Sequence, residues 1–215
     1  MNITSALFSR RVLAFLLVIC VSSGPGYAAT NDDPAAVIDS TVQSLFDEFT
    51  ASRERLELNK TELFVLVNDI ASPLFDFNYI SKLVLAKSWK NASEQQKTDF
   101  AIEFKRLLIV TYATALFQYT GKETMSFGET GFREKKGVKL AKVNTEVFIN
   151  EGAPISVVYD MIKKADGEWK IYNLTVGDLN MVLNYRNVIQ SSIQSDGLDA
   201  LILSMKENNQ KHYQQ

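Results

Sequence analysis

Few side chains in this chain of 215 residues could act as nucleophiles, bases or metal ligands. It contains one histidine, His212, and one cysteine, Cys20. His212 lies near the C-terminus, in a polar segment that we expect to be frayed. Ser-His-Asp triads, Cys-His triads and most zinc sites require a positioned histidine, and no phosphate-binding loop, Gly-x-Gly-x-x-Gly run or Asp-rich calcium loop is present. We therefore expect no cofactor and no resident metal.

The carboxylates are the remaining candidates for acid–base chemistry. Asp76, between Phe75 and Phe77, could be a buried acid with a raised pKa, but the sequence favours a helix cap at the start of the helix that follows. Asp160 falls on the polar side of an expected strand, and Asp178 is expected to cap a helix. No two carboxylates can be paired from the sequence as general acid and base, so a conventional hydrolase is disfavoured.

The first residues have the pattern of a secretory signal. Arg10 and Arg11 precede an apolar run over residues 12–21, which is too short to span a bilayer. Small residues follow, and we predict cleavage after Ala28. A lipoprotein signal has a small residue just before the cysteine that is modified. Ile19 precedes Cys20, so we interpret Cys20 as part of the apolar core of the signal. The predicted organisation is a signal peptide (1–28), one domain (29–210) and a polar tail (211–215), in a protein that acts outside the cytoplasm.

Charge argues against one class of partner. Removing residues 1–28 takes away two of the 23 basic residues and none of the 25 acidic ones, which leaves a net charge of −4. Nucleic-acid binding requires a basic face. We therefore expect no nucleic acid among the partners.

Hydrophobic periodicity gives the expected elements. Apolar residues at helical spacing predict helices over residues 34–49, 60–71, 77–85 and 94–121, the last opened by a capping box from Ser93 to Gln96. A period of two predicts strands over 123–132, 138–149, 155–163 and 168–176, joined by short turns. Helices follow over 178–192 and 198–208. The pattern predicts an α+β fold in which helices pack on a twisted four-stranded antiparallel sheet.

Aromatic residues are abundant where helix meets sheet. The chain has 13 Phe, 8 Tyr and 2 Trp. Such residues usually form a core, but a curved sheet facing long apolar helices can also enclose a cavity for an apolar ligand. The sequence does not separate a filled core from a hollow one.

Two blocks of sequence carry a resemblance to a known family. The first comprises residues 75–77 (FDF), 88–97 (SWKNASEQQK), 104–108 (FKRLL), 111–113 (TYA) and Tyr119. The second comprises residues 155–159 (ISVVY), 166–173 (DGEWKIYN), 184–186 (NYR) and 197–202 (GLDALI). Together they resemble the toluene-tolerance (Ttg2/MlaC) family of periplasmic phospholipid carriers, over residues 34–208. The chain departs from the family pattern at Ala86, Asn173 and residues 177–180 (GDLN).

The resemblance implies a fold similar to nuclear-transport-factor-2-like domains with a helical lipid-binding part. It also implies a monomeric carrier in the periplasm of a Gram-negative bacterium, in transient contact with membranes. Such a carrier moves glycerophospholipid between an outer-membrane lipoprotein–porin complex and an inner-membrane ABC transporter with an MCE-domain subunit. This transport maintains the lipid asymmetry of the outer membrane.

On this reading, acyl chains would lie between the sheet and the helices, bound without covalent chemistry. Arg186 is a candidate for the phosphate, or for a structural ion pair. The predicted lipid-binding residues are Phe77, Ile80, Leu83, Leu108, Tyr112, Leu116, Val147, Ile149, Tyr159, Met161, Ile171, Met181, Val182, Tyr185 and Arg186.

Three alternatives remain open at the level of sequence. The cargo could be a hopanoid or another polycyclic lipid. The protein could instead be an enzyme on a nuclear-transport-factor-2-like cone, with Asp76 or Asp160 as the base. It could also be a chaperone-like module whose apolar groove takes a peptide.

Overall fold

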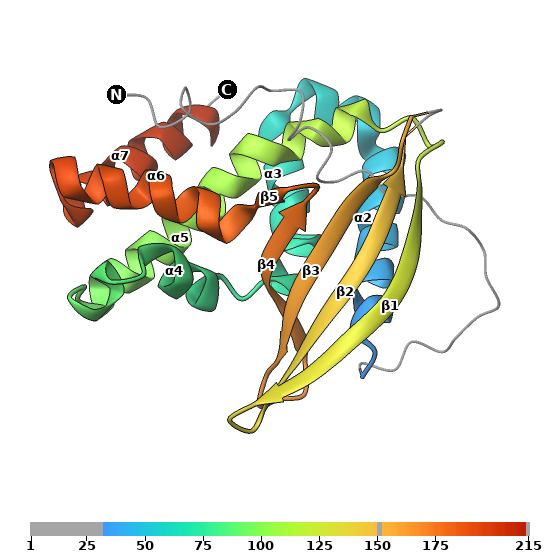
Figure 1. Ribbon diagram of the computed structural model, residues 1–215. Coiled ribbons are helices and arrows are strands. Elements are labelled where there is room, and N and C mark those ends of the chain that lie inside the picture. The colour runs from blue at the N-terminus through green and yellow to red at the C-terminus, as the bar shows by residue number, and fades with distance from the viewer. Residues whose placement is uncertain (1–31, 150–151, 214–215) are drawn as a thin grey trace.

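The computed structural model describes residues 32–149 and 152–213. Helices precede and follow an antiparallel sheet, and Figure 1 shows α4, α6 and α7 on the β4 side of that sheet. The predicted signal peptide and turn residues 150–151 lie outside the described residues. None of the described helices combines the length and the apolar character needed to cross a bilayer.

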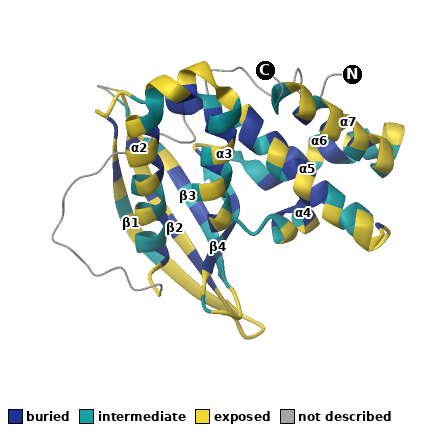
Figure 2. Cartoon of the chain, turned by 180° about the vertical axis from the view of Figure 1, so that it is seen from behind, coloured by how far each residue is buried: buried dark blue, intermediate teal, exposed yellow. Residues whose placement is uncertain are grey.

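The first two described helices cover one face of the sheet. Helix α2 (Pro34–Leu58) begins where Asp33 accepts a hydrogen bond from the Ala35 amide at 2.9 Å, an N-cap followed by proline in the first turn. Its buried side chains include Leu45, Phe49 and Leu56, at the spacing of one helix face. Viewed from behind, α2 and α3 (Lys60–Ile70) lie across the strands with exposed residues outward (Figure 2).

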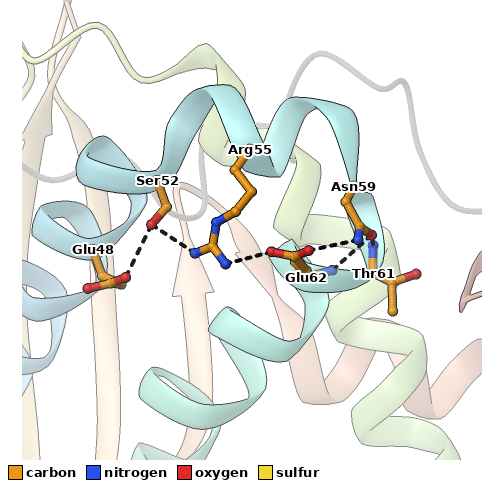
Figure 3. A network of polar contacts seen from close by, with 6 residues as sticks. All are labelled: Glu48, Ser52, Arg55, Asn59, Thr61 and Glu62. Atoms are coloured by element: carbon orange, nitrogen blue, oxygen red, sulfur yellow. Dashed lines mark hydrogen bonds and ion pairs between the residues drawn. The ribbon is translucent and has the colours of Figure 1, made fainter.

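A polar network fixes the corner between α2 and α3 (Figure 3). The Asn59 side chain accepts hydrogen bonds from the amides of Thr61 and Glu62, at 3.1 and 3.3 Å, and so caps α3. Its own amide donates to Glu62 Oε1 at 2.9 Å. Arg55 Nη1 of α2 lies 2.7 Å from Glu62 Oε2. The end of one helix is therefore tied directly to the start of the next.

Each of the next two helices, α4 (Phe77–Leu85) and α5 (Glu94–Tyr112), is preceded by a short 3₁₀ helix. These are η1 (Ser72–Leu74) before α4 and η2 (Ser88–Lys90) before α5. The predicted cap at Asp76 is confirmed, since its Oδ1 accepts from the Tyr79 amide at 2.9 Å. The predicted capping box is confirmed as well, with both Ser93–Gln96 bonds present.

The predicted extension of α5 to residue 121 is wrong. The α-helix ends at Tyr112 and continues as a 3₁₀ helix, η3 (Ala113–Gln118). A tertiary contact overrides the helical pattern, because the Arg53 guanidinium of α2 donates to the carbonyls of Phe117 and Tyr119, each at 2.8 Å. The β-branched residues before Tyr112 also have reduced helix propensity.

The sheet is an antiparallel meander in the order β1-β2-β3-β4-β5. The first four strands, β1 (Thr124–Lys135), β2 (Val138–Phe148), β3 (Ile155–Lys163) and β4 (Trp169–Val176), are those predicted. The fifth, β5 (Leu179–Asn180), has two residues and was not predicted. It pairs with β4 through a turn at Gly177, whose φ of 55° favours glycine. The α+β class is confirmed.

The two last helices differ from prediction at their ends. Helix α6 (Met181–Asp196) is capped by Asn180, whose side chain accepts from the Leu183 amide at 3.0 Å. The cap predicted at Asp178 is therefore wrong, because that residue belongs to the β4–β5 turn. Helix α7 (Leu198–Tyr213) extends to Tyr213, inside the segment expected to be frayed, and Tyr213 packs on Phe64 with ring centroids 5.1 Å apart.

Buried apolar side chains form two clusters. The sheet core lies between the sheet and α2, α3 and η3, and includes Phe49, Leu63 and Val143. The helical core lies among α4, α5, α6 and α7, and includes Val84 and Ile189. Helix α5 joins them, because its Phe100, Phe104 and Leu107 belong to the helical core and its Ile109 and Val110 belong to the sheet core.

Candidate functional site

An apolar cavity of about 50 Å³ lies where the helical core meets the edge of the sheet. Helices α4, α5 and α6 form one side and strand β4 forms the other. The residues that line it are Phe75, Ile80, Val84, Phe104, Leu108, Ile171, Tyr172, Asn173, Leu174, Met181, Val182 and Tyr185. No charged side chain belongs to this lining, so it suits an apolar ligand.

A β-bulge explains why four consecutive residues of β4 line the cavity. Asp160 pairs with Asn173 and Met161 pairs with Ile171, so Tyr172 is an extra residue opposite β3. In a regular strand, neighbouring side chains point to opposite faces. The bulge interrupts that alternation, and residues 171–174 all reach the cavity.

Asn173 connects the sheet to the start of α6. Its Oδ1 accepts a hydrogen bond from the Val182 amide at 3.2 Å, and its Nδ2 donates to Asp160 Oδ2 at 2.9 Å. The Val182 amide is in the first turn of α6 and has no partner within the helix. Asn173 is buried and thus uses both ends of its amide to hold α6 on β4.

The two carboxylates considered as catalytic bases have structural partners. Asp76 caps α4 with one oxygen, and its Oδ2 lies 2.6 Å from Lys164 Nζ. Asp160 accepts from Asn173 and lies 3.9 Å from Lys142 Nζ. Neither belongs to the lining of the apolar cavity. Within the described residues, no group of three or more His, Cys, Asp or Glu side chains is arranged to hold a metal ion.

A half-buried tyrosine of α5, Tyr112, and a buried one of α6, Tyr185, join these helices beside the cavity. The hydroxyls of Tyr112 and Tyr185 are 2.7 Å apart, and the Tyr185 ring meets Phe104 edge-on with centroids 5.1 Å apart. Burial raises the pKa of Tyr112 to about 12. Burial, and to a smaller extent the neighbouring phenol, holds the pKa of Tyr185 well above its ordinary value. The pair is therefore a neutral hydrogen-bonded contact at physiological pH.

This pair predicts alkaline destabilisation. In the unfolded chain both phenols lose their protons near pH 10, whereas the folded chain retains them to higher pH, so their contribution to stability is complete below pH 10 and is lost above it. Tyr185→Phe should lower the unfolding free energy by about 1 kcal/mol at pH 8 through the lost hydrogen bond. At pH 11 the wild-type protein should lose about 1.4 kcal/mol of unfolding free energy because the Tyr185 phenol ionises in the unfolded chain, and the variant, which has no phenol there, should avoid that loss. Urea unfolding at both pH values measures this, and a deficit equal at both would contradict it.

The structure brings some of the predicted lipid-binding residues to the cavity. Those that line it are Ile80, Leu108, Ile171, Met181, Val182 and Tyr185. Phe77 and Leu83 pack against the helical core without lining the cavity, and Tyr112 is behind Tyr185. The predicted location between sheet and helices therefore corresponds to β4, α4, α5 and α6 alone.

The other predicted residues lie elsewhere. Leu116, Val147, Tyr159 and Met161 are buried in the sheet core, and Ile149 packs against it. Leu116 belongs to η3, and the strand residues Val147, Tyr159 and Met161 face α2 and η3 rather than the cavity. Arg186 neither lines the cavity nor forms an ion pair among the described residues. Its Nε instead donates to the Leu83 carbonyl at the end of α4, at 2.8 Å.

Several lining residues were missed. They are Phe75, Val84, Phe104, Tyr172, Asn173 and Leu174. Helical spacing could have identified two of them, since Val84 follows Ile80 by four positions and Phe104 precedes Leu108 by four. The β4 residues depend on the bulge, which has no signal in the sequence.

The sequence matches one family model and several known proteins. The family model described as "MlaC protein" matches residues 39–207. A toluene tolerance protein, ttg2D, of Pseudomonas putida is 27% identical over 185 residues, covering 85% of this chain and 83% of that protein. The intermembrane phospholipid transport system binding protein MlaC of Haemophilus influenzae is 23% identical over 198 residues, covering 92% and 91%.

A solved structure shares the fold. The phospholipid-binding protein from Ralstonia solanacearum, determined in complex with a phospholipid, is 25% identical with a TM-score of 0.71, and the match covers 84% of this chain and 98% of that one. The family model covers most of the chain, from the second turn of α2 to the middle of α7. The chain therefore belongs to the MlaC family.

Proposed function

We propose that this protein is a phospholipid carrier that holds acyl chains in the apolar cavity between β4 and helices α4, α5 and α6. The observation that carries the proposal is this cavity, which has no charged side chain in its lining. Support comes from the Ralstonia protein of similar fold, which was solved with a phospholipid. The name of the Haemophilus relative, an intermembrane phospholipid transport binding protein, points the same way.

The energetics of lipid tails explain why a carrier must enclose them. Burial is worth about 0.8 kcal/mol for each CH₂ group, so two acyl chains exposed to water would cost on the order of 20 kcal/mol. A headgroup can remain solvated. Binding therefore needs apolar walls rather than a constellation of reactive groups, which agrees with the chemistry of the lining.

The cavity must widen to take a tail. Its volume is about 50 Å³, whereas ligand pockets usually have about 300–1,000 Å³. Helices α4 and α6 are joined to each other, because Arg186 and Gln190 of α6 donate to the carbonyls of Leu83 and Leu85, at 2.8 and 2.9 Å. We infer that α4 and α6 move together, away from β4, when a tail enters, and that the hydrogen bond from the Val182 amide to Asn173 breaks in this movement.

The proposal extends to location and partners. The signal-like residues 1–28 and the family support a carrier in the periplasm of a Gram-negative bacterium. It would act as a monomer between an outer-membrane lipoprotein–porin complex and an inner-membrane ABC transporter with an MCE-domain subunit, in transient contact with both membranes. This transport would maintain the lipid asymmetry of the outer membrane.

Native mass spectrometry of the protein, purified from a bacterial periplasm without detergent, tests the proposal. We expect a bound mass equal to one or two intact phospholipids, with phospholipid fragments on activation. A polycyclic lipid in the fragments would favour the hopanoid alternative. A protein that carries no lipid, even after incubation with liposomes, would contradict the carrier and favour the peptide-binding or enzymatic alternatives.

A further inference from the structure

A second hollow lies next to the apolar cavity and shares a wall with it. This hollow, of about 430 Å³, is bounded by η1, the start of α4, α5 and the turn between β3 and β4. Phe75 lines both spaces. On α5, Phe104 lines the cavity, and Lys105, the next residue, lines the hollow. Phe75 therefore lies between the cavity and this hollow.

The hollow is cationic, whereas the cavity has no charge. Lys105, Lys164 and Lys170 line it together with one carboxylate, Asp76. We call it the lysine hollow. Three ammonium groups against one carboxylate leave its lining with a positive balance, next to a cavity that has no charged residue in its lining.

Two of these lysines already have partners. Lys164 Nζ lies 2.6 Å from Asp76 Oδ2. Lys170 Nζ donates to the Pro73 carbonyl at 2.8 Å and pairs with Glu168. They form a rim whose ammonium groups are held in place by the fold.

Lys105 differs from them. The residue is half-buried, and its side-chain ammonium makes no hydrogen bond or ion pair with any residue that the structure describes. The acidic group nearest in sequence, Glu103, is occupied by Arg106 at 2.8 Å and by Asn209 at 2.9 Å. A lysine whose ammonium has no protein partner is suited to an anion that comes from outside the protein.

We propose that the lysine hollow receives the phosphate of the bound lipid, with Lys105 as the cation that meets it. The inference rests on the proposed function, because the tails of the same molecule occupy the apolar cavity. The hollow is open to solvent on its outer side, so the alcohol beyond the phosphate stays in water. Recognition is thus directed at the phosphodiester that all glycerophospholipids share.

A pair of single-chain ligands isolates the phosphate. Oleoyl-lysophosphatidylglycerol and monooleoylglycerol have the same acyl chain and differ by the phosphoglycerol group. The protein, purified from the periplasm and stripped of lipid, is titrated with each ligand below its micelle concentration, and displacement of a fluorescent apolar probe is recorded. We expect the phosphate ligand to bind about tenfold more tightly, and we expect 0.5 M salt to reduce that ratio.

Variants then test Lys105. Lys105→Gln should bring the ratio to about two or less, without changing the affinity for monooleoylglycerol, and Lys105→Arg should preserve it. Lys206→Gln, which removes an exposed lysine from α7 outside the lysine hollow, should leave both affinities unchanged. Urea midpoints equal to wild type show that each variant is folded.

The outcomes separate the two claims. If both ligands displace the probe and Lys105→Gln leaves their ratio unchanged, the phosphate site is wrong and the carrier stands. If neither ligand displaces the probe, the proposed function is overturned together with the phosphate site. If inorganic phosphate alone removes the preference at equal ionic strength, the hollow binds free anions and the assignment to a lipid headgroup is wrong.

Discussion

Leu108→Asp is expected to weaken phospholipid binding by about a hundredfold or more. Leu108 lines the apolar cavity on α5 and is half-buried. In the free protein an aspartate here can keep part of its hydration, so the fold should persist. When a tail enters, the carboxylate must lose that water or take up a proton, and the penalty is several kcal/mol. A loss of about 2.8 kcal/mol in binding free energy already weakens the affinity by a factor of one hundred.

Leu203→Asp is the matched control for this experiment. Leu203 is on α7, 56% exposed and outside the cavity lining, and its replacement makes the same change in charge and in helix propensity. Lipid occupancy by native mass spectrometry should fall in Leu108→Asp and remain at the wild-type level in Leu203→Asp. If Leu108→Asp folds and carries lipid as wild type does, the cavity is not where the tails bind.

Asn209→Asp is expected to destabilise the protein by about 3–5 kcal/mol. Asn209 is 1% exposed and Glu103 is 5% exposed. The Asn209 amide nitrogen donates to both the carbonyl and Oε2 of Glu103, each at 2.9 Å. Aspartate would replace this donor with an acceptor and place two carboxylates in contact in a buried site.

The control is the same substitution one position earlier. Asn208 is half-buried and its side chain makes no hydrogen bond in the part of the chain that the structure describes, so Asn208→Asp should change stability by about 0.5 kcal/mol or less. Urea unfolding at neutral pH compares the two. The deficit of Asn209→Asp should shrink as the pH is lowered toward 4, because protonation of one carboxyl removes the repulsion. Equal midpoints for the two variants would contradict the role of Asn209.

Local signals in the sequence predict much of the fold. Ser93 and Gln96 form the expected capping box, and Asp76 caps α4, because these contacts are formed by residues close in sequence. Features that depend on distant residues were not predictable. Arg53 ends the regular part of α5 from another helix, and Asn209 extends α7 through its contact with Glu103, 106 residues away.

The site was predictable only in part, for a related reason. Alternation identifies inward residues such as Tyr159 and Met161, but it does not say which layer of helices they face. The chain has two apolar cores, and only the structure shows that these residues meet α2. The lysine hollow draws on η1, α4, α5 and the β3–β4 turn. Lys105 therefore had no feature in the sequence that separates it from the other lysines.

The closeness of the cavity walls has a consequence for delivery. Ile80, Val84 and Phe104 are already buried, so an entering tail replaces protein contacts as well as leaving water. The affinity for cargo is therefore lower than the order of 20 kcal/mol that two bare tails would gain on leaving water. If the protein carries lipid as proposed, reclosing of the walls would recover their contacts each time cargo departs. An acceptor would then have to provide only the remaining difference in binding free energy, and handover between two binding partners could proceed without an energy source in the carrier itself.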